Sequence, residues 1–271
     1  MPNFLVSCPI FVDKCTVWMQ TVEGGIKNSI LISVVMPNYN GHRFVEQAID
    51  SVLNQTYPNF ELLVVDDCSK DGSLSLIQQK AQSDNRIKVI ALKHNAGVAN
   101  ARNVGIKEAR GEFIALLDND DLWTEDKLER QLTLAGNGAD IVYCSYDFID
   151  EQNNSIKKPF IVPQQTNFNK MLASSVISCS TSFIKTELMQ VHPFNSDFSH
   201  EDYVLWMELL RVCPTAYGDP KVLMHYCQVT GSRSKAKERW NAYRKALKLN
   251  AVTSARAFVR YAVKGVVKYY L

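Results

Sequence analysis

The chain has 271 residues, enough for one large domain or one domain with an appendage, and its formal net charge is +2. With 46% hydrophobic and 21% charged residues, it has the composition of an ordinary globular protein. Its seven cysteines are odd in number and include no C-x-x-C pair, which excludes a disulfide scaffold and a structural zinc site and favours a reducing compartment.

Residues 1–29 form an N-terminal segment without helical or strand periodicity. The first cation is Lys14 and the apolar stretch is interrupted, so the segment does not fit a secretory signal. We expect an appendage that carries no chemistry.

From residue 30 onward, short apolar runs alternate with segments of helical period. We predict strands over 30–36, 61–65, 87–92, 112–117 and 141–146. We predict helices over 44–53, from 73 onward, over 97–109 and over 122–134. This alternation predicts βαβ units and a Rossmann-like, mostly parallel sheet flanked by helices.

The rhythm changes after a polar turn at 150–154. A strand candidate follows at 178–185, a helix at 203–212, and a helical segment from 235 to the end. We therefore expect a catalytic domain over 30–232, divided into halves at 30–121 and 122–232, and a basic helical extension over 233–271.

A cluster of acidic residues follows a strand that we expect to be buried on both faces. Phe113–Leu117 is uniformly apolar, and Asp118, Asn119, Asp120 and Asp121 come directly after it. The carboxyl ends of parallel strands form the ligand-binding edge of an open sheet. Two carboxylates one residue apart suit a hard divalent cation such as Mg²⁺ that also binds phosphate oxygens. The alternative is an acidic turn that caps the next helix.

Other polar residues are expected at the same edge. Asp66-Asp67 ends the second strand, and P-N-Y-N-G ends the first, with Tyr39 available to stack on a nucleobase or to pack at a turn. A helix that begins near Gly97 offers backbone N–H groups to phosphate, and Arg102 can bind a diphosphate bidentately. Neither a dinucleotide fingerprint nor a Walker pattern is present, which disfavours a nicotinamide enzyme and a P-loop nucleotidase.

The C-terminal segment differs in charge from the rest of the chain. Residues 233–271 contain eleven Lys/Arg residues and one acidic residue. The rest of the chain contains nineteen Lys/Arg residues and twenty-seven acidic residues. Arg256, Arg260, Lys264 and Lys268 recur every four residues and form a basic stripe on a helix. Such a helix suits an anionic bilayer surface, and the alternative is a solvated face of a packing helix. No apolar run is long enough to predict a membrane-spanning helix.

Taken together, five motifs resemble those of glycosyltransferase family 2, whose members have the GT-A fold. The resemblance spans about residues 30 to 245 and is closest to bacterial enzymes of O-antigen, capsule or teichuronic-type polysaccharides. The motifs are S-V-V-M-P-N-Y-N at 33–40, V-V-D-D-C-S-K-D-G-S at 64–73, N-A-G-V-A-N-A-R-N-V-G at 95–105, L-L-D-N-D-D-L-W at 116–123 and H-E-D-Y-V-L-W at 200–206.

The resemblance implies a donor site at the sheet edge. Pro37 and Tyr39 would line the nucleobase, and Asp67 would accept its N–H group, with Asp66 beside it. Arg102 would lie near the diphosphate and the sugar.

The resemblance also implies a cation site and a base. Asp118 and Asp120 match the D-x-D pair that holds Mg²⁺ or Mn²⁺, with Asp120 expected in the more direct contact. Asp202 matches the catalytic base of inverting members. Cys227 stands where relatives often carry an arginine, so Arg233 of the following G-S-R-S loop, or Lys235 just after it, would supply a cation for the phosphates.

The implied activity is an inverting transfer from a nucleotide-sugar, with UDP-sugar expected, to a hydroxyl of a glycan acceptor. The acceptor would be linked to polyprenyl diphosphate, and the enzyme would work in the cytoplasm at the inner face of the membrane without binding nucleic acid. Two alternatives remain at this point: a sugar-phosphate nucleotidyltransferase, and a catalytically silent subunit that binds nucleotide or glycan.

Overall fold

The computed structural model describes residues 29–228 and 236–270. The expected appendage before residue 29 and the expected phosphate-binding Arg233 or Lys235 lie outside these described residues. The strands are β1 Ile32–Asn38, β2 Phe60–Asp66, β3 Ile87–Ala91, β4 Phe113–Leu116, β5 Leu122–Trp123, β6 Ile141–Ile149, β7 Ser155–Phe160, β8 Gln165–Thr166, β9 Phe183–Lys185 and β10 Ala216–Cys227. The α-helices are α2 Val45–Leu53, α3 Ser73–Ser83, α4 Val98–Glu108, α5 Lys127–Gly136, α6 Phe168–Ala173, α7 Thr186–Val191, α8 Glu201–Val212, α9 Ala236–Asn241 and α10 Ala251–Tyr270.

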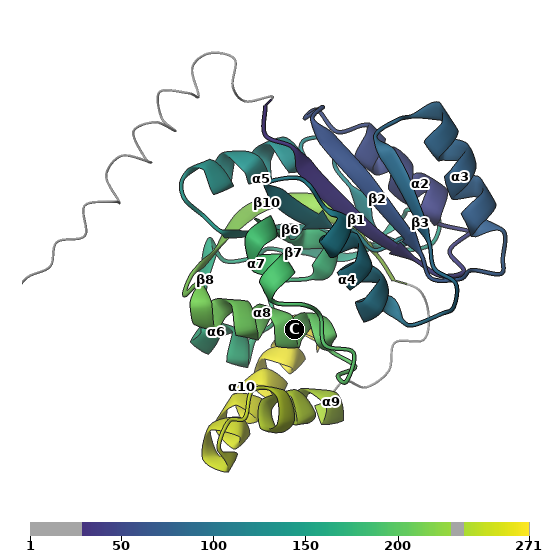
Figure 1. The fold of residues 1–271 in the computed structure, drawn as a ribbon. Helices are drawn as coiled ribbons and strands as arrows, with labels where there is room; N and C mark the ends of the chain where they lie inside the picture. Colours follow the sequence, from purple (N-terminus) through teal and green to yellow (C-terminus); the bar gives the residue numbers. More distant parts are fainter. Residues whose placement is uncertain (1–28, 229–235, 271) are drawn as a thin grey trace, which may run out of the picture.

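One mixed sheet runs through the molecule in the order β3-β2-β1-β4-β9-β6-β10-β5, with β7 beside β6 and β8 beside β10 (Figure 1). The first four strands are mutually parallel, as the alternation of elements predicts. β9 then runs antiparallel to both β4 and β6, and β10 is parallel to β6. The carboxyl ends of β1, β2, β4, β6 and β10 therefore point toward the same edge.

Two hydrophobic cores lie on opposite faces of this sheet. Strand side chains alternate between faces, so Val34 belongs to the core that includes residues of α2, α3 and α5, whereas Val35 belongs to the core that includes residues of α4 and α8. All seven residues of β1 are buried, as expected for a central strand covered on both faces.

Helix α4 approaches the sheet closely because residue 105 has no side chain. A Cβ atom at Gly105 would lie 2.5 Å from Cγ1 of Val35 and 3.1 Å from Cγ2 of Val65. Both valines are fully buried and stiff at χ1, so they cannot move aside without cost. This contact sets how α4 lies over β1 and β2.

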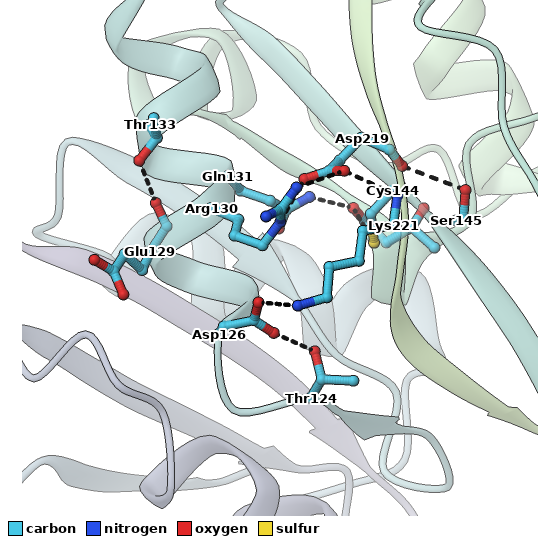
Figure 2. Close-up of polar contacts among 11 residues, drawn as sticks. Thr124, Asp126, Glu129, Arg130, Gln131, Thr133, Cys144, Ser145, Asp219 and Lys221 are labelled. Carbon is cyan, nitrogen blue, oxygen red and sulfur yellow. Dashed lines mark hydrogen bonds and ion pairs between the residues drawn. The ribbon is translucent and has the colours of Figure 1, made fainter.

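Polar contacts fasten α5 to β10 (Figure 2). Arg130 of α5 donates from Nε to Oδ2 of Asp219 at 2.8 Å and from Nη2 to Oδ1 at 3.1 Å, and Asp219 is 3% exposed. Lys221, two residues further along β10, pairs with Asp126 just before α5 (Figure 2). These contacts fix the strand whose last residues reach the carboxyl edge of the sheet.

Three predicted elements differ from the observed ones. The predicted helix over 122–134 begins only at Lys127, because residues 122–123 form β5 and pair with β10. The predicted strand over 178–185 is a 3₁₀ turn at Cys179–Thr181 followed by the shorter β9. The predicted C-terminal helix is divided into α9, a π-helical turn at Ala242–Ala246, and α10.

The C-terminal helices pack onto α6 and α8 at one end of the molecule (Figure 1). Tyr243 is fully buried, and its hydroxyl donates to the carbonyl of Leu172 at 2.6 Å. Leu247 and Ala257 belong to the same core as α8. The proposed boundary at 232/233 stays a prediction. Within the described residues, no helix combines the length and the apolar character needed to cross a membrane.

We predict that Gly105→Ala lowers the free energy of unfolding by about 1–3 kcal/mol, as an overpacked core does. Alanine favours a helix over glycine by only about 1 kcal/mol, so the clash with Val35 decides the sign. Urea denaturation measures the effect. Lys107→Ala, at an exposed position of the same helix, should change it by less than about 0.5 kcal/mol. An equally stable Gly105→Ala protein would contradict the close approach of α4.

Candidate active site at the carboxyl edge of the sheet

The loops after β1, β2 and β4 meet at one edge, as their parallel pairing predicts. Asn38, the last residue of β1, donates from Nδ2 to Oδ1 of Asp66 at 2.8 Å. Its own Oδ1 accepts from Nδ2 of Asn119 at 2.7 Å. Asn38 thus joins the acidic end of β2 to the turn after β4. The contact between these two asparagines was not predicted from the sequence, although both lie within the quoted motifs.

The glycine of P-N-Y-N-G makes room for this junction. A Cβ atom at Gly41 would lie 2.0 Å from Nδ2 of Asn119 and 2.4 Å from Oδ1 of Asn38. Real Cβ atoms do not come this close to a neighbouring atom. A larger residue at position 41 would therefore separate the two asparagines.

Asp66 and Asp67 are both almost fully buried and already hydrogen-bonded. Asp66 accepts from Ser69 Oγ at 2.6 Å as well as from Asn38. The two oxygens of Asp67 accept from the backbone N–H groups of Ala96 and Gly97, both at 2.8 Å. Asp67 thereby ties the start of α4 to the end of β2, and its binding of a nucleobase stays a prediction.

The two other residues expected around a nucleobase differ in exposure. Pro37 is buried within β1, whereas Tyr39 is 51% exposed just beyond it. The ring is available for stacking at the edge of the sheet.

Arg102 connects the acidic turn after β4 to the acidic pair at the start of α8. It extends from α4 and donates from Nη2 to Oδ1 of Asp118 at 2.6 Å. It also donates from Nη1 to Oε1 of Glu201, at the start of α8, at 2.8 Å. Its side chain is 6% exposed. Burial lowers the pKa of this guanidinium, but the neighbouring carboxylates outweigh burial and hold the pKa well above its ordinary value.

The E-D pair begins α8, so its carboxylates also lie near the positive end of the helix dipole. Asp202 is partly buried, and its Oδ1 accepts from the backbone N–H of Tyr203 at 2.6 Å. Burial raises the pKa of Glu201, and the charge of Asp202 adds to this, although Arg102 opposes both. The contact between Glu201 and Arg102 was not predicted from the sequence.

The pKa of the buried Cys179 thiol is affected by the same charged groups. Burial raises the pKa of this thiol well above its ordinary value, and Arg102 opposes the shift. The carboxylates of Asp118, Asp202 and Glu201 raise it further. All four charged groups therefore lie close enough to act on the same sulfur atom.

In the turn after β4, the carboxylates of Asp118 and Asp120 carry more negative charge than Arg102 alone compensates. Burial raises the pKa of Asp120 to about 6, and the charge of Asp118 contributes to the shift. A divalent cation between these carboxylates would relieve that repulsion, so the donor set fits Mg²⁺ or Mn²⁺. Among the described residues, no group of three or more His, Cys, Asp or Glu side chains forms a complete metal site. A cation shared with a diphosphate needs only one or two protein carboxylates.

A family model described as Glycosyl transferase family 2 matches residues 33–190. TuaG of Bacillus subtilis, named as a glycosyltransferase of teichuronic acid biosynthesis, is 33% identical over 244 residues, covering 88% of this chain and 97% of the relative. WfgD of Escherichia coli is 41% identical over 183 residues, covering 67% of this chain and 70% of the relative. Its name is UDP-Glc:alpha-D-GlcNAc-diphosphoundecaprenol beta-1,3-glucosyltransferase.

Solved structures with low sequence identity share the fold. Residues 1–349 of S. aureus TarS in complex with UDP-GlcNAc superpose with a TM-score of 0.69 at 20% identity, covering 88% of this chain and 73% of that one. A mannosyltransferase of Pyrobaculum calidifontis in complex with GDP-Man and Mn²⁺ superposes with a TM-score of 0.63 at 17% identity. The match covers 95% of this chain and 82% of the mannosyltransferase chain. The predicted GT-A fold is confirmed.

We predict that Arg102→Gln lowers the free energy of unfolding by about 3 kcal/mol, because it leaves two carboxylates near each other without their cation. Glu201→Gln in the same protein should recover part of this loss, giving a coupling energy of about 0.5–3 kcal/mol in a double-mutant cycle. Arg110→Gln, at an exposed position just beyond α4, should be nearly neutral. Strictly additive effects of the Arg102 and Glu201 substitutions would contradict the bridge.

Proposed function

The chain belongs to glycosyl transferase family 2, and we propose that it moves a sugar from a UDP-sugar to a hydroxyl of a glycan acceptor with inversion at the anomeric carbon. The observation that carries this proposal is the contact of Arg102 with both Asp118 and Glu201. It brings a D-x-D turn, suited to a diphosphate, next to an acidic helix start, suited to a base.

The donor would lie along the ends of β1 and β2. Tyr39, half exposed, would stack on the base. Asp67 would accept the N–H group of the base through lone pairs that its two backbone hydrogen bonds leave free, since each carboxylate oxygen has two. The names of WfgD and WfaP of Escherichia coli specify UDP-Glc as donor, which supports UDP as the nucleotide.

Asp118 and Asp120 would hold Mg²⁺ or Mn²⁺, which supplies charge neutralisation for the diphosphate of the leaving group. Arg102 is already in contact with Asp118 and would also donate hydrogen bonds to the oxygens of the diphosphate. A mannosyltransferase of the same fold was solved with GDP-Man and Mn²⁺, which supports the use of a divalent cation.

Asp202 would act as the general base. A carboxylate at this position removes the proton from the acceptor hydroxyl while the hydroxyl attacks the anomeric carbon opposite the leaving diphosphate. One such displacement inverts the configuration, and no second carboxylate is needed as a nucleophile. Glu201 would keep Arg102 in place beside this base.

The acceptor would be a glycan linked to polyprenyl diphosphate, in the synthesis of a bacterial surface polysaccharide. This part of the proposal relies on the relatives. The name of WfgD specifies a diphosphoundecaprenol-linked acceptor, and that of TuaG specifies teichuronic acid.

Helix α10 has an outward face that suits an anionic bilayer. Val252 and Val259 are both 61% exposed, and Arg256 and Arg260 are exposed beside them, whereas Ala257 faces the core. Exposed apolar and cationic side chains on one helical face favour the membrane interface. We propose that this face holds the enzyme at the cytoplasmic leaflet, where such an acceptor is embedded.

We predict that Asp202→Asn lowers kcat for sugar transfer by about 10²–10⁴-fold, because the amide cannot accept the proton. The affinity for UDP should stay within about twofold, since Asp202 has no proposed contact with the nucleotide. A UDP-release assay across UDP-sugars with a lipid-linked acceptor measures the rate, and calorimetry measures the affinity. Asp197→Asn, an exposed carboxylate before α8, is the matched control.

Unchanged turnover in the Asp202→Asn protein would contradict the base assignment. The same assay distinguishes the alternative activities. Release of pyrophosphate instead of UDP would favour a nucleotidyltransferase, and donor binding without release across all donors and acceptors would favour a silent binding subunit.

We predict that Arg256→Glu combined with Arg260→Glu reduces cosedimentation with phosphatidylglycerol vesicles by about tenfold or more, because each cation near an anionic surface contributes about 1 kcal/mol. The control for net charge is Lys107→Glu combined with Lys158→Glu, at two exposed lysines outside the C-terminal helices. Equal vesicle binding by the two double variants would contradict docking through α10.

A further inference from the structure

One buried serine holds both ends of the D-N-D-D turn. The backbone N–H of Asp118 donates to Oγ of Ser180 at 3.0 Å. The same hydroxyl donates to Oδ2 of Asp121 at 2.5 Å. Ser180 is fully buried in the 3₁₀ turn before β9, about sixty residues away along the chain, so the contact is made by the fold and not by local sequence.

Asp121 has a different role from the two other aspartates of the turn. It is 1% exposed, and its Oδ1 accepts from the backbone N–H of Cys227, the last residue of β10, at 3.1 Å. Both of its oxygens are therefore directed into the protein. The Asp118 side chain, in contrast, is 30% exposed and faces Arg102.

Ser180 is itself fixed from several directions. Nε1 of Trp123 donates to the carbonyl of Ser180 at 2.8 Å, and Nζ of Lys127 lies 3.9 Å from the centre of the Trp123 ring. Nε2 of Gln131 donates to the neighbouring carbonyl of Thr181 at 2.8 Å. The serine hydroxyl is thus a rigid point to which the turn is attached.

We propose that Ser180 and Asp121 are positioning residues for the divalent cation. They hold the backbone of Asp118 and the C-terminal end of the turn, so that the carboxylates of Asp118 and Asp120 reach a cation with the geometry it requires. Mg²⁺ and similar ions tolerate little deviation from octahedral coordination, and groups that orient a ligand commonly change metal affinity by 10–100-fold. The inference rests on the proposed function, which puts the cation at Asp118 and Asp120.

The test is the coupling between Mn²⁺ and UDP. The affinity for UDP is measured by calorimetry in MnCl₂ and again in EDTA. The coupling is the affinity in MnCl₂ divided by the affinity in EDTA. We expect Ser180→Ala to lower this ratio by about tenfold or more while the affinity in EDTA stays unchanged. Ser182→Ala is the matched control, because Ser182 is equally buried and donates only to Cys179 at 2.7 Å. It should retain the wild-type ratio.

Asp121→Asn is the second variant, and it decides the question if Ser180→Ala does not fold. The amide keeps the size of the carboxylate but cannot accept from both Ser180 and Cys227, so the same fall in the ratio is expected. A folded variant with the wild-type ratio, at either position, overturns the inference. A wild-type protein whose UDP affinity is the same in MnCl₂ and in EDTA instead overturns the proposed cation site itself, and the inference with it.

Discussion

A buried guanidinium is the constraint on which the site depends. Arg102 is 5% exposed and must find anionic partners, because a desolvated cation without them is strongly destabilising. It finds Asp118 after β4 and Glu201 at the start of α8. These segments belong to the two predicted halves of the chain, so one ion-pair network adds to the β4–β9 pairing that joins the halves. The absence of a side chain at Gly105 lets α4 bring Arg102 to that position.

The acidic excess around Arg102 gives the site its chemical character. Arg102 contacts both Asp118 and Glu201, and Asp120 and Asp202 lie next to these residues in the two acidic motifs. Burial raises the pKa of Asp120, and the charge of Asp118 adds to the shift, although Arg102 opposes it. A divalent cation with a diphosphate would complement the charge of such a site. The basic residues of the chain are instead concentrated toward the C-terminal helices, whose exposed arginines lie far along the sequence from these carboxylates. This difference in charge supports our proposal that the acidic site binds a metal-bound nucleotide and the basic helix an anionic surface.

Local patterns predicted the parts of the fold that depend on local burial. The apolar runs that became β1, β2 and β4, and the acidic residues that follow them, could be identified because parallel strands of this kind are buried on both faces. Non-local contacts could not. Leu122 and Trp123 fit a helical period but pair with β10, about a hundred residues away. The hydrogen bond of Ser180 to Asp121 and the burial of Tyr243 against α6 likewise cannot be recognised from the spacing of residues in the sequence. The motif resemblance was therefore necessary to add Asp202 to the site that the sheet edge predicts around Arg102 and Asp118.

Anomalous diffraction from crystals grown with UDP and MnCl₂ tests the account most directly. We predict one manganese peak at the carboxyl edge of the sheet, within about 2.0–2.3 Å of a carboxylate oxygen of Asp118 or Asp120 and of both UDP phosphates. Arg102 should remain in contact with Glu201 and lie within hydrogen-bonding distance of the diphosphate. UDP bound with its phosphates away from Arg102, or a manganese peak remote from the turn after β4, would contradict the account.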